Sequence, residues 1–145
     1  MNESILVEYP LPCSAADAFD LYVHRIGDWW PRGFTAHGDG LDTVTIEPTV
    51  GGRVYERGRD GSVFGWGVVQ SYEPGSELVH SFHLAQDAQH PTEVAVRFTD
   101  ALAGCHMRFE HRGWTMDNVH ERAKFEFAGG GWDVVLGAFV ELARS

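Results

Sequence analysis

The chain has 145 residues, of which 43% are hydrophobic and 12% aromatic, and its 11 basic and 21 acidic residues give a formal net charge of −10. A chain of this length and composition suits one packed domain, which we expect to span residues 1–145. The negative charge repels phosphate backbones and anionic lipids, which excludes nucleic acid and membrane surfaces as expected partners. The sequence contains no signal-like start and no apolar run of about 18 residues, so we expect no membrane insertion and a cytoplasmic location.

The first elements follow directly from the pattern of apolar residues. Every second residue from 5 to 11 is apolar, with Leu6 and the charged Glu8 between them, which predicts a strand over residues 4–11 that two prolines then close. Ser14 and Asp17 resemble a capping box and predict the start of a helix. An apolar face of Ala15, Phe19 and Tyr22 extends this helix to about His24.

The middle of the chain changes to a period of two. Residues 27–31 interrupt the helix with two adjacent indoles, and the glycine-rich stretch 32–40 predicts the longest loop of the chain. Strands are then predicted over 41–46, 53–57, 63–72, 77–84, 93–102 and 105–112, with Asp60-Gly61 as a tight hairpin turn. Because these strands follow one another as hairpins, the sheet should be antiparallel.

A helical period returns after Gly113. One or two helical turns are predicted from about Met116 to Phe127, and the run of three glycines at 129–131 should interrupt the helix. Beyond Gly131, one apolar stripe predicts a long C-terminal helix that lies on the sheet; it consists of Trp132, Val135, Leu136, Phe139, Val140 and Ala143. The predicted fold class is α+β: a curved antiparallel sheet of about six to seven strands around this helix, with one or two short helices after the first strand.

Several motifs occur in an order that resembles a known family. They are Trp29-Trp30-Pro31, Gly51-Gly52-Arg53-Val54-Tyr55-Glu56, Asp60-Gly61 before Trp66-Gly67-Val68-Val69, Pro91-Thr92-Glu93-Val94, Glu110-His111-Arg112-Gly113-Trp114, and Gly131-Trp132. The ordered set covers nearly the whole chain and resembles the family of activators of heat-shock-protein-90 ATPase homologues. That family belongs to the START-like superfamily, also called SRPBCC.

This resemblance implies the helix-grip fold, also known from birch-pollen-allergen-like proteins, and a ligand cavity between sheet and helix. Superfamily members include lipid carriers, hormone receptors, polyketide cyclases and a co-chaperone domain, so the fold constrains the activity weakly.

The aromatic residues are more numerous than one layer of helix on sheet needs, which suggests that some of them line a cavity. In strand 63–72 we expect Phe64, Trp66, Val68, Gln70 and Tyr72 to share one face. The expected cavity lining is Trp30, Phe64, Trp66, His80, Phe82, Phe98, Met107, Phe109, His111, Trp114, Trp132 and Leu136.

The eight histidines do not form chelating pairs. His80 and His83 are three residues apart, and His106 and His111 five apart, so on straight strands each pair points to opposite faces. Cys13 and Cys105 lie far apart without a metal-like spacing. We therefore expect no metal and no cofactor.

Polar residues on the apolar faces leave alternatives open. His111 shares a face with Met107 and Phe109, where it either fixes the corner by a structural hydrogen bond, orients a ligand, or acts in acid–base catalysis. His80 has the same alternatives. Glu56 fits a cross-strand ion pair on the outer face, the alternative being an inward side chain that anchors a ligand amine or hydroxyl.

Three hypotheses for the function follow. The first is a module that binds a hydrophobic or aromatic small molecule in the cavity. The second is a cyclase-, aromatase- or hydrolase-like enzyme that uses the same cavity. The sequence shows no catalytic constellation for such an enzyme, so its catalytic residues are unknown. The third is a chaperone-interacting module. As partners, we expect a hydrophobic small-molecule ligand and leave open whether a second copy of this chain forms a homodimer with it.

Overall fold

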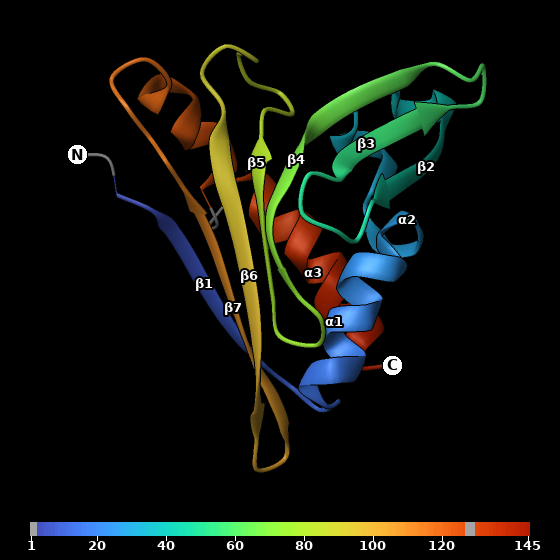
Figure 1. The fold of residues 1–145 in the computed structure, drawn as a ribbon, viewed down its shortest axis with the longest axis vertical. Helices are drawn as coiled ribbons and strands as arrows, with labels where there is room; N and C mark the ends of the chain where they lie inside the picture. The colour runs from blue at the N-terminus through green and yellow to red at the C-terminus, as the bar shows by residue number, and fades with distance from the viewer. Residues whose placement is uncertain (1–2, 127–129) are drawn as a thin grey trace.

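The computed structural model describes residues 3–126 and 130–145, drawn in Figure 1. Its strands are β1 (Ile5–Leu11), β2 (Leu41–Ile46), β3 (Arg53–Gly58), β4 (Val63–Glu73), β5 (Glu77–Phe82), β6 (Thr92–Ala101) and β7 (Gly104–Arg112). Its α-helices are α1 (Ala15–His24), α2 (Ile26–Trp29) and α3 (Gly131–Ala143), and its 3-10 helices are η1 (Arg32–Phe34), η2 (Gly38–Gly40) and η3 (Val119–Phe125).

The seven strands form one antiparallel sheet in the order β1-β7-β6-β5-β4-β3-β2. Consecutive strands pair as hairpins from β2 to β7, and the first strand returns to pair with the last, with Ile5 opposite His111. The sheet curls so that β2 and β3 turn away from the long strands, and α1 and α3 lie inside the curl (Figure 1). The predicted fold class and the antiparallel sheet are therefore confirmed.

Helix α3 fills the curl with one apolar face. Its buried residues are Trp132, Val135, Leu136, Phe139, Val140 and Ala143, which is the stripe predicted from the sequence. The Phe139 ring meets the Tyr22 ring of α1 and the Phe98 ring of β6 at centroid distances of 5.3 and 6.1 Å. Burying each such side chain contributes about 1.5–3 kcal/mol, so this stripe holds the helix against the sheet.

Helix α1 begins at the predicted cap. The backbone N–H of Asp17 donates to Ser14 Oγ at 3.1 Å, which satisfies one of the free N–H groups of the first turn. The buried face holds Phe19 and Tyr22, both almost fully enclosed. Helix α1 thus forms where its sequence predicts a helix, and its apolar face packs between the sheet and α3.

The segment after α1 differs from the expected interruption and loop. Residues 26–29 form the short helix α2, and the stretch 32–40 contains the single-turn helices η1 and η2. Trp29 and Trp30 are buried, with 5% and 7% of their surface exposed. The indole N–H of Trp29 donates to the Leu21 carbonyl and that of Trp30 to the Phe34 carbonyl, so burial of two indoles imposes helical turns on a glycine-rich segment.

The predicted faces of strand β4 are partly wrong. Trp66 is buried as expected, but Val68 is 46% exposed and Val69 is buried instead. The pairing of β4 with its neighbours skips Trp66 on one side and Gln70 on the other. Each such bulge shifts the alternation of side chains by one residue, which simple counting cannot anticipate.

Smaller differences concern the ends of elements. Strand β5 ends at Phe82 and not at residue 84, β6 runs from 92 to 101, and the helical turns predicted from residue 116 are the 3-10 helix η3. The expected features at Phe127 and Gly129 lie outside the described residues. Within the described part, no helix has the length and apolar character that crossing a membrane requires.

Candidate functional site

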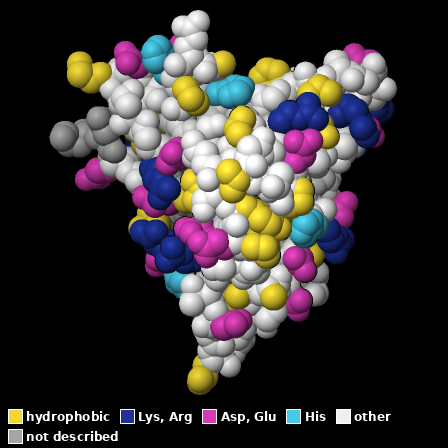
Figure 2. Space-filling model, in the orientation of Figure 1, with side chains coloured by type: hydrophobic (Ala, Val, Ile, Leu, Met, Phe, Trp, Pro, Cys, Tyr) yellow, Lys and Arg dark blue, Asp and Glu magenta, His cyan; other side chains and the backbone are white. Residues whose placement is uncertain are grey.

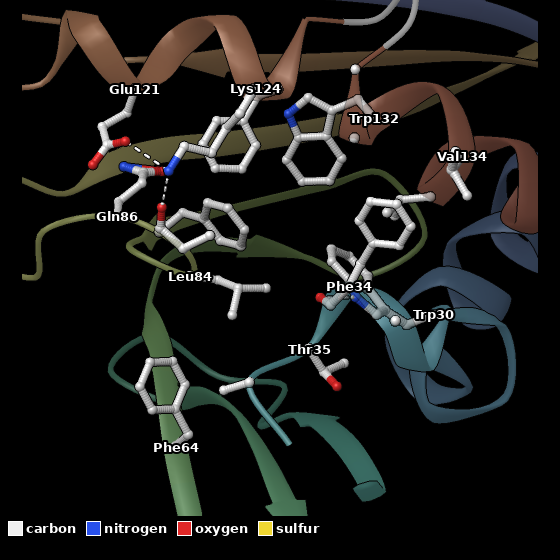
Figure 3. Close-up of a pocket in the computed structure, with 18 of the residues that line it drawn as sticks. Trp30, Phe34, Thr35, Phe64, Leu84, Gln86, Glu121, Lys124, Trp132 and Val134 are labelled. Atoms are coloured by element: carbon white, nitrogen blue, oxygen red, sulfur yellow. Dashed lines mark hydrogen bonds and ion pairs between the residues drawn. The ribbon is translucent and has the colours of Figure 1, made fainter. Parts of the chain in front are cut away.

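An open pocket of about 930 Å³ lies at the end of the curl where α3 begins. Five segments line it: residues 30–36 after α2, Phe64 on β4, residues 82–87 at the end of β5, residues 121–125 of η3, and residues 130–135 at the start of α3. Figure 3 shows side chains from these segments around one shared space. The pocket is therefore assembled from parts of the chain that are far apart in sequence.

Most of the wall is aromatic or aliphatic. Trp30, Phe82 and Trp132 form the buried inner side, while Phe34 and Phe64 are each 39% exposed at the opening. Large apolar side chains that stay partly exposed around a hollow are typical of a binding surface for an apolar molecule.

The opposite side of the pocket is polar. The ammonium group of Lys124 donates to the Ala85 carbonyl at 2.7 Å and forms an ion pair with Glu121 at 2.7 Å (Figure 3). Gln86 and Asp87 complete this side. With two carboxylates and one lysine, the charged groups of the lining sum to a negative charge, so an anionic ligand would meet repulsion here.

A hydrogen-bonded chain runs behind the wall through His111. The indole N–H of Trp132 donates to His111 Nδ1 at 2.9 Å, and His111 Nε2 lies 2.6 Å from Thr92 Oγ1. Because the indole can only donate, Nδ1 carries no proton, and the neutral ring donates to Thr92 through Nε2. Thr92 Oγ1 in turn lies 3.1 Å from Oε1 and 3.2 Å from Nε2 of Gln86. The chain therefore begins and ends at residues of the pocket wall.

Burial keeps His111 uncharged. Its side chain is fully enclosed. Burial, together with the nearby His80 and Arg122, lowers the pKa of His111 from 6.5 to about 3. Both ring nitrogens are used by protein groups, which favours the structural alternative for His111 over direct contact with a ligand.

The corner after β7 is fixed by further bonds. The Trp114 indole N–H donates to the His111 carbonyl at 3.1 Å, and the two rings lie 4.5 Å apart. Asn118 is buried; its side chain accepts from the Thr115 N–H and donates to the His90 carbonyl. These bonds tie η3 to the loop between β5 and β6, so two walls of the pocket hold a fixed position relative to each other.

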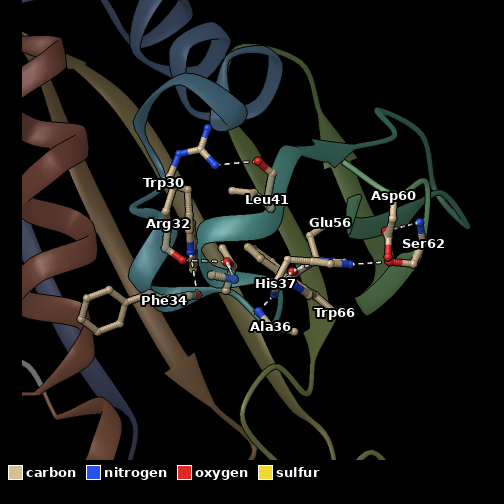
Figure 4. A network of polar contacts seen from close by, with 12 residues as sticks. Trp30, Arg32, Phe34, Ala36, His37, Leu41, Glu56, Asp60, Ser62 and Trp66 are labelled. Carbon is tan, nitrogen blue, oxygen red and sulfur yellow. Dashed lines mark hydrogen bonds and ion pairs between the residues drawn. The ribbon is translucent and has the colours of Figure 1, made fainter. Parts of the chain in front are cut away.

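Glu56 points inward, and the expected outer-face position is wrong. One carboxylate oxygen accepts from the Ala36 N–H and from the Trp66 indole, both at 2.8 Å, and the other accepts from the N–H and Nδ1 of His37 at 2.7 and 2.6 Å (Figure 4). Burial would raise the pKa of Glu56, but these hydrogen bonds outweigh burial and hold the pKa below its usual value. Because Glu56 is saturated by protein donors, its role here is to hold residues 35–37 of the pocket wall.

The twelve residues expected to line a cavity fall into three groups. Trp30, Phe64, Phe82 and Trp132 line the pocket. Trp66 and His80, with Trp30, Phe82 and Trp132 again, border a much smaller chamber deeper inside. The remaining residues, Phe98, Met107, Phe109, His111, Trp114 and Leu136, are buried in the packed interior and line neither space.

The sequence did not reveal several residues of the lining. Phe34 lies in the stretch expected to be a loop, and Leu84 and Gln86 lie at and just beyond the end of a predicted strand. Lys124 lies within the predicted helical turns but was not among the residues expected to line a cavity. The pair of aromatic residues Trp30 and Phe34, within a glycine-rich segment, was the one sequence feature that indicated this part of the lining.

The structure also bears on metal binding. Within the described part of the chain, no group of three or more His, Cys, Asp or Glu side chains is placed to hold a metal ion.

Surface charges do not collect into a patch of one sign on the face that Figure 2 shows. On that face, basic side chains lie beside acidic ones. Ion pairs such as Arg97 with Glu77 and Arg112 with Glu93, 3.2 and 3.0 Å apart, join charges of opposite sign. Such exposed pairs contribute little to stability. The pocket is therefore the feature of this protein that most strongly indicates a function.

A curved antiparallel sheet closed over a C-terminal helix, with an apolar pocket at its open end, defines a START-like protein with the helix-grip fold. The sequence matches the family of Activator of Hsp90 ATPase homolog 1-like proteins over residues 24–144, and the chain belongs to this family. No curated protein matches the sequence.

Solved structures share the fold. The protein MLL2253 from Mesorhizobium loti is 19% identical with a TM-score of 0.70, and the match covers 97% of this chain and 96% of that one. The anthrahydroquino-gamma-pyrone synthase Txn09 is 22% identical with a TM-score of 0.61, covering 96% of both chains. DynU16, a putative protein of the dynemicin biosynthetic locus, is 14% identical with a TM-score of 0.71, covering all of this chain and 51% of the other.

Proposed function

We propose that this protein binds an uncharged, hydrophobic or aromatic small molecule in the pocket at the start of α3. The observation that carries the proposal is the apolar lining of a space of about 930 Å³, a volume within the range of small-molecule sites. The family match and the fold are consistent with such a role.

The lining supports a ligand with a flat apolar body. Trp30 and Trp132 meet edge to face with centroids 5.8 Å apart, and Phe82 lies 5.6 Å from Trp132. A further aromatic ring between Phe34 and Phe64 would extend this set of ring contacts, each worth about 0.5–1.5 kcal/mol beyond its buried area. The solved structures with this fold include Txn09, whose name describes a synthase of an aromatic pyrone, which agrees with this class of ligand.

Binding is favoured over catalysis by the state of the polar groups. His111 is neutral and bonded on both ring nitrogens, and Glu56 accepts four hydrogen bonds from the protein. Neither group is free to move a proton to or from a molecule in the pocket. Interaction with a chaperone stays an alternative that the family name alone suggests.

A titration with a neutral, environment-sensitive dye such as Nile red tests the proposal. We expect saturable uptake of one dye per chain, and about a tenfold weaker affinity in Phe64→Ala because a large part of the apolar wall is lost. Val68→Ala is the matched control, since Val68 is exposed on the same strand but outside the pocket. Absence of saturable uptake, or equal weakening by both variants, would contradict the proposal.

A further inference from the structure

The two cysteines of the chain, far apart in sequence, come together where β1 passes into α1. Leu11, the last residue of β1, pairs with Cys105 of β7. The backbone N–H of Ala15, the first residue of α1, donates to the Asp100 carboxylate at 2.9 Å, and Asp100 also pairs with Cys105. Cys13 lies midway between Leu11 and Ala15. The chain on both sides of Cys13 is therefore held beside Cys105.

The residues that precede the two cysteines lie directly against each other. A Cβ atom at Gly104 would collide with the Leu11 carbonyl oxygen and would lie 2.9 Å from the Cα atom of Pro12. Only glycine allows this approach, because any side chain at residue 104 would push the two backbones apart. The start of β7 and the turn that contains Cys13 are thus in backbone contact.

The two thiols meet in a hydrogen bond. Cys105 is only 2% exposed, and Cys13 is half-buried against the same hydrophobic core. Burial, the neighbouring Cys13 and Asp100, and the hydrogen bond together raise the pKa of Cys105 from 9.0 to about 11. A hydrogen bond raises the pKa of the thiol that donates it, so Cys105 donates to the Cys13 sulfur.

The two thiols differ in their access to solvent. Cys105 is enclosed and keeps its proton, whereas Cys13 is partly exposed. An oxidant in solution therefore reaches Cys13 first, with Cys105 directly behind it. This arrangement of an accessible thiol and an enclosed partner thiol is the one that closes a disulfide bond after oxidation of the first sulfur.

We propose that Cys13 and Cys105 form a redox modification site, at which a peroxide oxidises Cys13 and Cys105 then closes a disulfide bond within the same chain. The inference goes beyond the proposed function and does not depend on it, since the lining of the pocket contains neither cysteine.

The reaction balances with one peroxide molecule. The Cys13 thiolate attacks one peroxide oxygen, the O–O bond breaks, and the second oxygen leaves as water after it takes up a proton. The Cys105 sulfur then attacks the sulfenic acid on Cys13, the S–O bond breaks, and the departing hydroxide takes the Cys105 proton to form a second water. The two thiols lose two electrons, and the peroxide is reduced to water.

The bond would fasten the end of an edge strand. Strand β1 pairs with β7 alone, and it passes into α1 at the lower end of the molecule in Figure 1. The loop closed by a bond between residues 13 and 105 contains both α1 and α2 and the strands β2 to β6. Closing so long a loop restricts the unfolded chain strongly, so the oxidised protein should be more stable than the reduced protein.

Peptide mapping after oxidation tests the inference. Trypsin should release residues 1–25 and 98–108 as peptides with one cysteine each. After treatment of the reduced protein with hydrogen peroxide, we expect a monomer in which mass spectrometry finds these two peptides joined, and dithiothreitol should separate them. Cys13→Ser is the matched control and should give no joined peptide. Cys105→Ala should also give none, while its Cys13 is oxidised further to the sulfinic acid.

Two results would overturn the site. One is a wild-type Cys13 that becomes a sulfinic acid, or joins the Cys13 of a second chain, without the bond to Cys105. The other is a Cys13 that stays reduced when an exposed model thiol in the same solution is fully oxidised.

Thermal unfolding tests whether the bond fastens the fold. The midpoint of the oxidised wild type should lie about 5 °C or more above that of the reduced protein. Cys13→Ser treated with the same peroxide controls for oxidation of methionines, and its midpoint should not rise. A midpoint of the cross-linked protein that equals or falls below the reduced value would overturn the stabilising role of the bond.

Discussion

The indole N–H of Trp132 donates a hydrogen bond to Nδ1 of His111 across 2.9 Å, and this bond joins the first turn of α3 to the last strand of the sheet. Trp132 also lines the pocket, whereas His111 is fully enclosed behind it. The position of one pocket wall therefore depends on a hydrogen bond in the protein interior.

Replacing Trp132 by Phe should destabilise the protein by about 2–4 kcal/mol. The change removes the donor, leaves His111 Nδ1 buried without a partner, and reduces the apolar volume of the core. The free energy of unfolding from denaturant titration measures the loss. Val134→Ala, on the exposed side of the same helix, should change this free energy by less than about 0.5 kcal/mol. Equal losses in the two variants would show that the hydrogen bond between Trp132 and His111 contributes nothing to the stability of the fold.

Stability should decrease as the pH falls from 7 to 5. Burial lowers the pKa of His111 to about 3 and that of His80 to about 4, both from 6.5. Below pH 6.5 the unfolded chain binds a proton at each ring and the folded protein does not, so protonation favours unfolding. Each histidine then lowers the free energy of unfolding by up to about 1.4 kcal/mol per pH unit.

Denaturant titrations at pH 7, 6 and 5 measure this slope. His111→Gln should reduce the slope, because glutamine accepts from Trp132 and donates to Thr92 without titrating. The stability gained above pH 6.5 by the two neutral rings is thus lost as the pH approaches 4. A stability that does not change between pH 7 and 5 would rule out neutral buried histidines.

Glu56→Gln should destabilise the protein and loosen residues 35–37. An amide has one accepting oxygen, so two of the four donors around Glu56 lose their acceptor, at a cost of about 2–4 kcal/mol in total. Hydrogen exchange should accelerate at the backbone N–H groups of Ala36 and His37 before the core strands exchange. Glu47→Gln provides the control, because Glu47 pairs with Arg53 at the surface and its loss should change little. Unchanged exchange at Ala36 would refute this role of Glu56.

Gly67→Ala should disrupt the pairing of β4 with β5. A Cβ atom at residue 67 would lie 1.8 Å from the Ser81 carbonyl oxygen, which belongs to the backbone and cannot turn aside. We expect a loss of about 3 kcal/mol or more in the free energy of unfolding. A Cβ at Gly65, two residues away on the same strand, meets nothing within 4 Å, so Gly65→Ala should be tolerated. Thermal unfolding of the two variants makes the comparison. Similar unfolding midpoints would contradict the close approach of the Ser81 carbonyl oxygen to Gly67.

The order of the elements could be predicted because local patterns determine it. The alternation of residues 5–11, the cap at Ser14 and the stripe from Trp132 to Ala143 are each complete within one segment. The order of motifs also indicated the family and with it the helix-grip fold, which the structure and the comparison with known families confirm. Each of these features depends on residues that are close together in the chain, so its pattern can be read within one short segment.

The site depended on contacts between distant segments. The inward position of Glu56 follows from donors on residues 36, 37 and 66, and the outward turn of Val68 follows from bulges in β4. Only the tertiary structure decided which aromatic residues face open space and which fill the core, because that choice depends on how far the curled sheet stands from α3. The sequence by itself determined which side chains are apolar and in what order they occur, and the packing of distant segments determined where they leave room for a ligand.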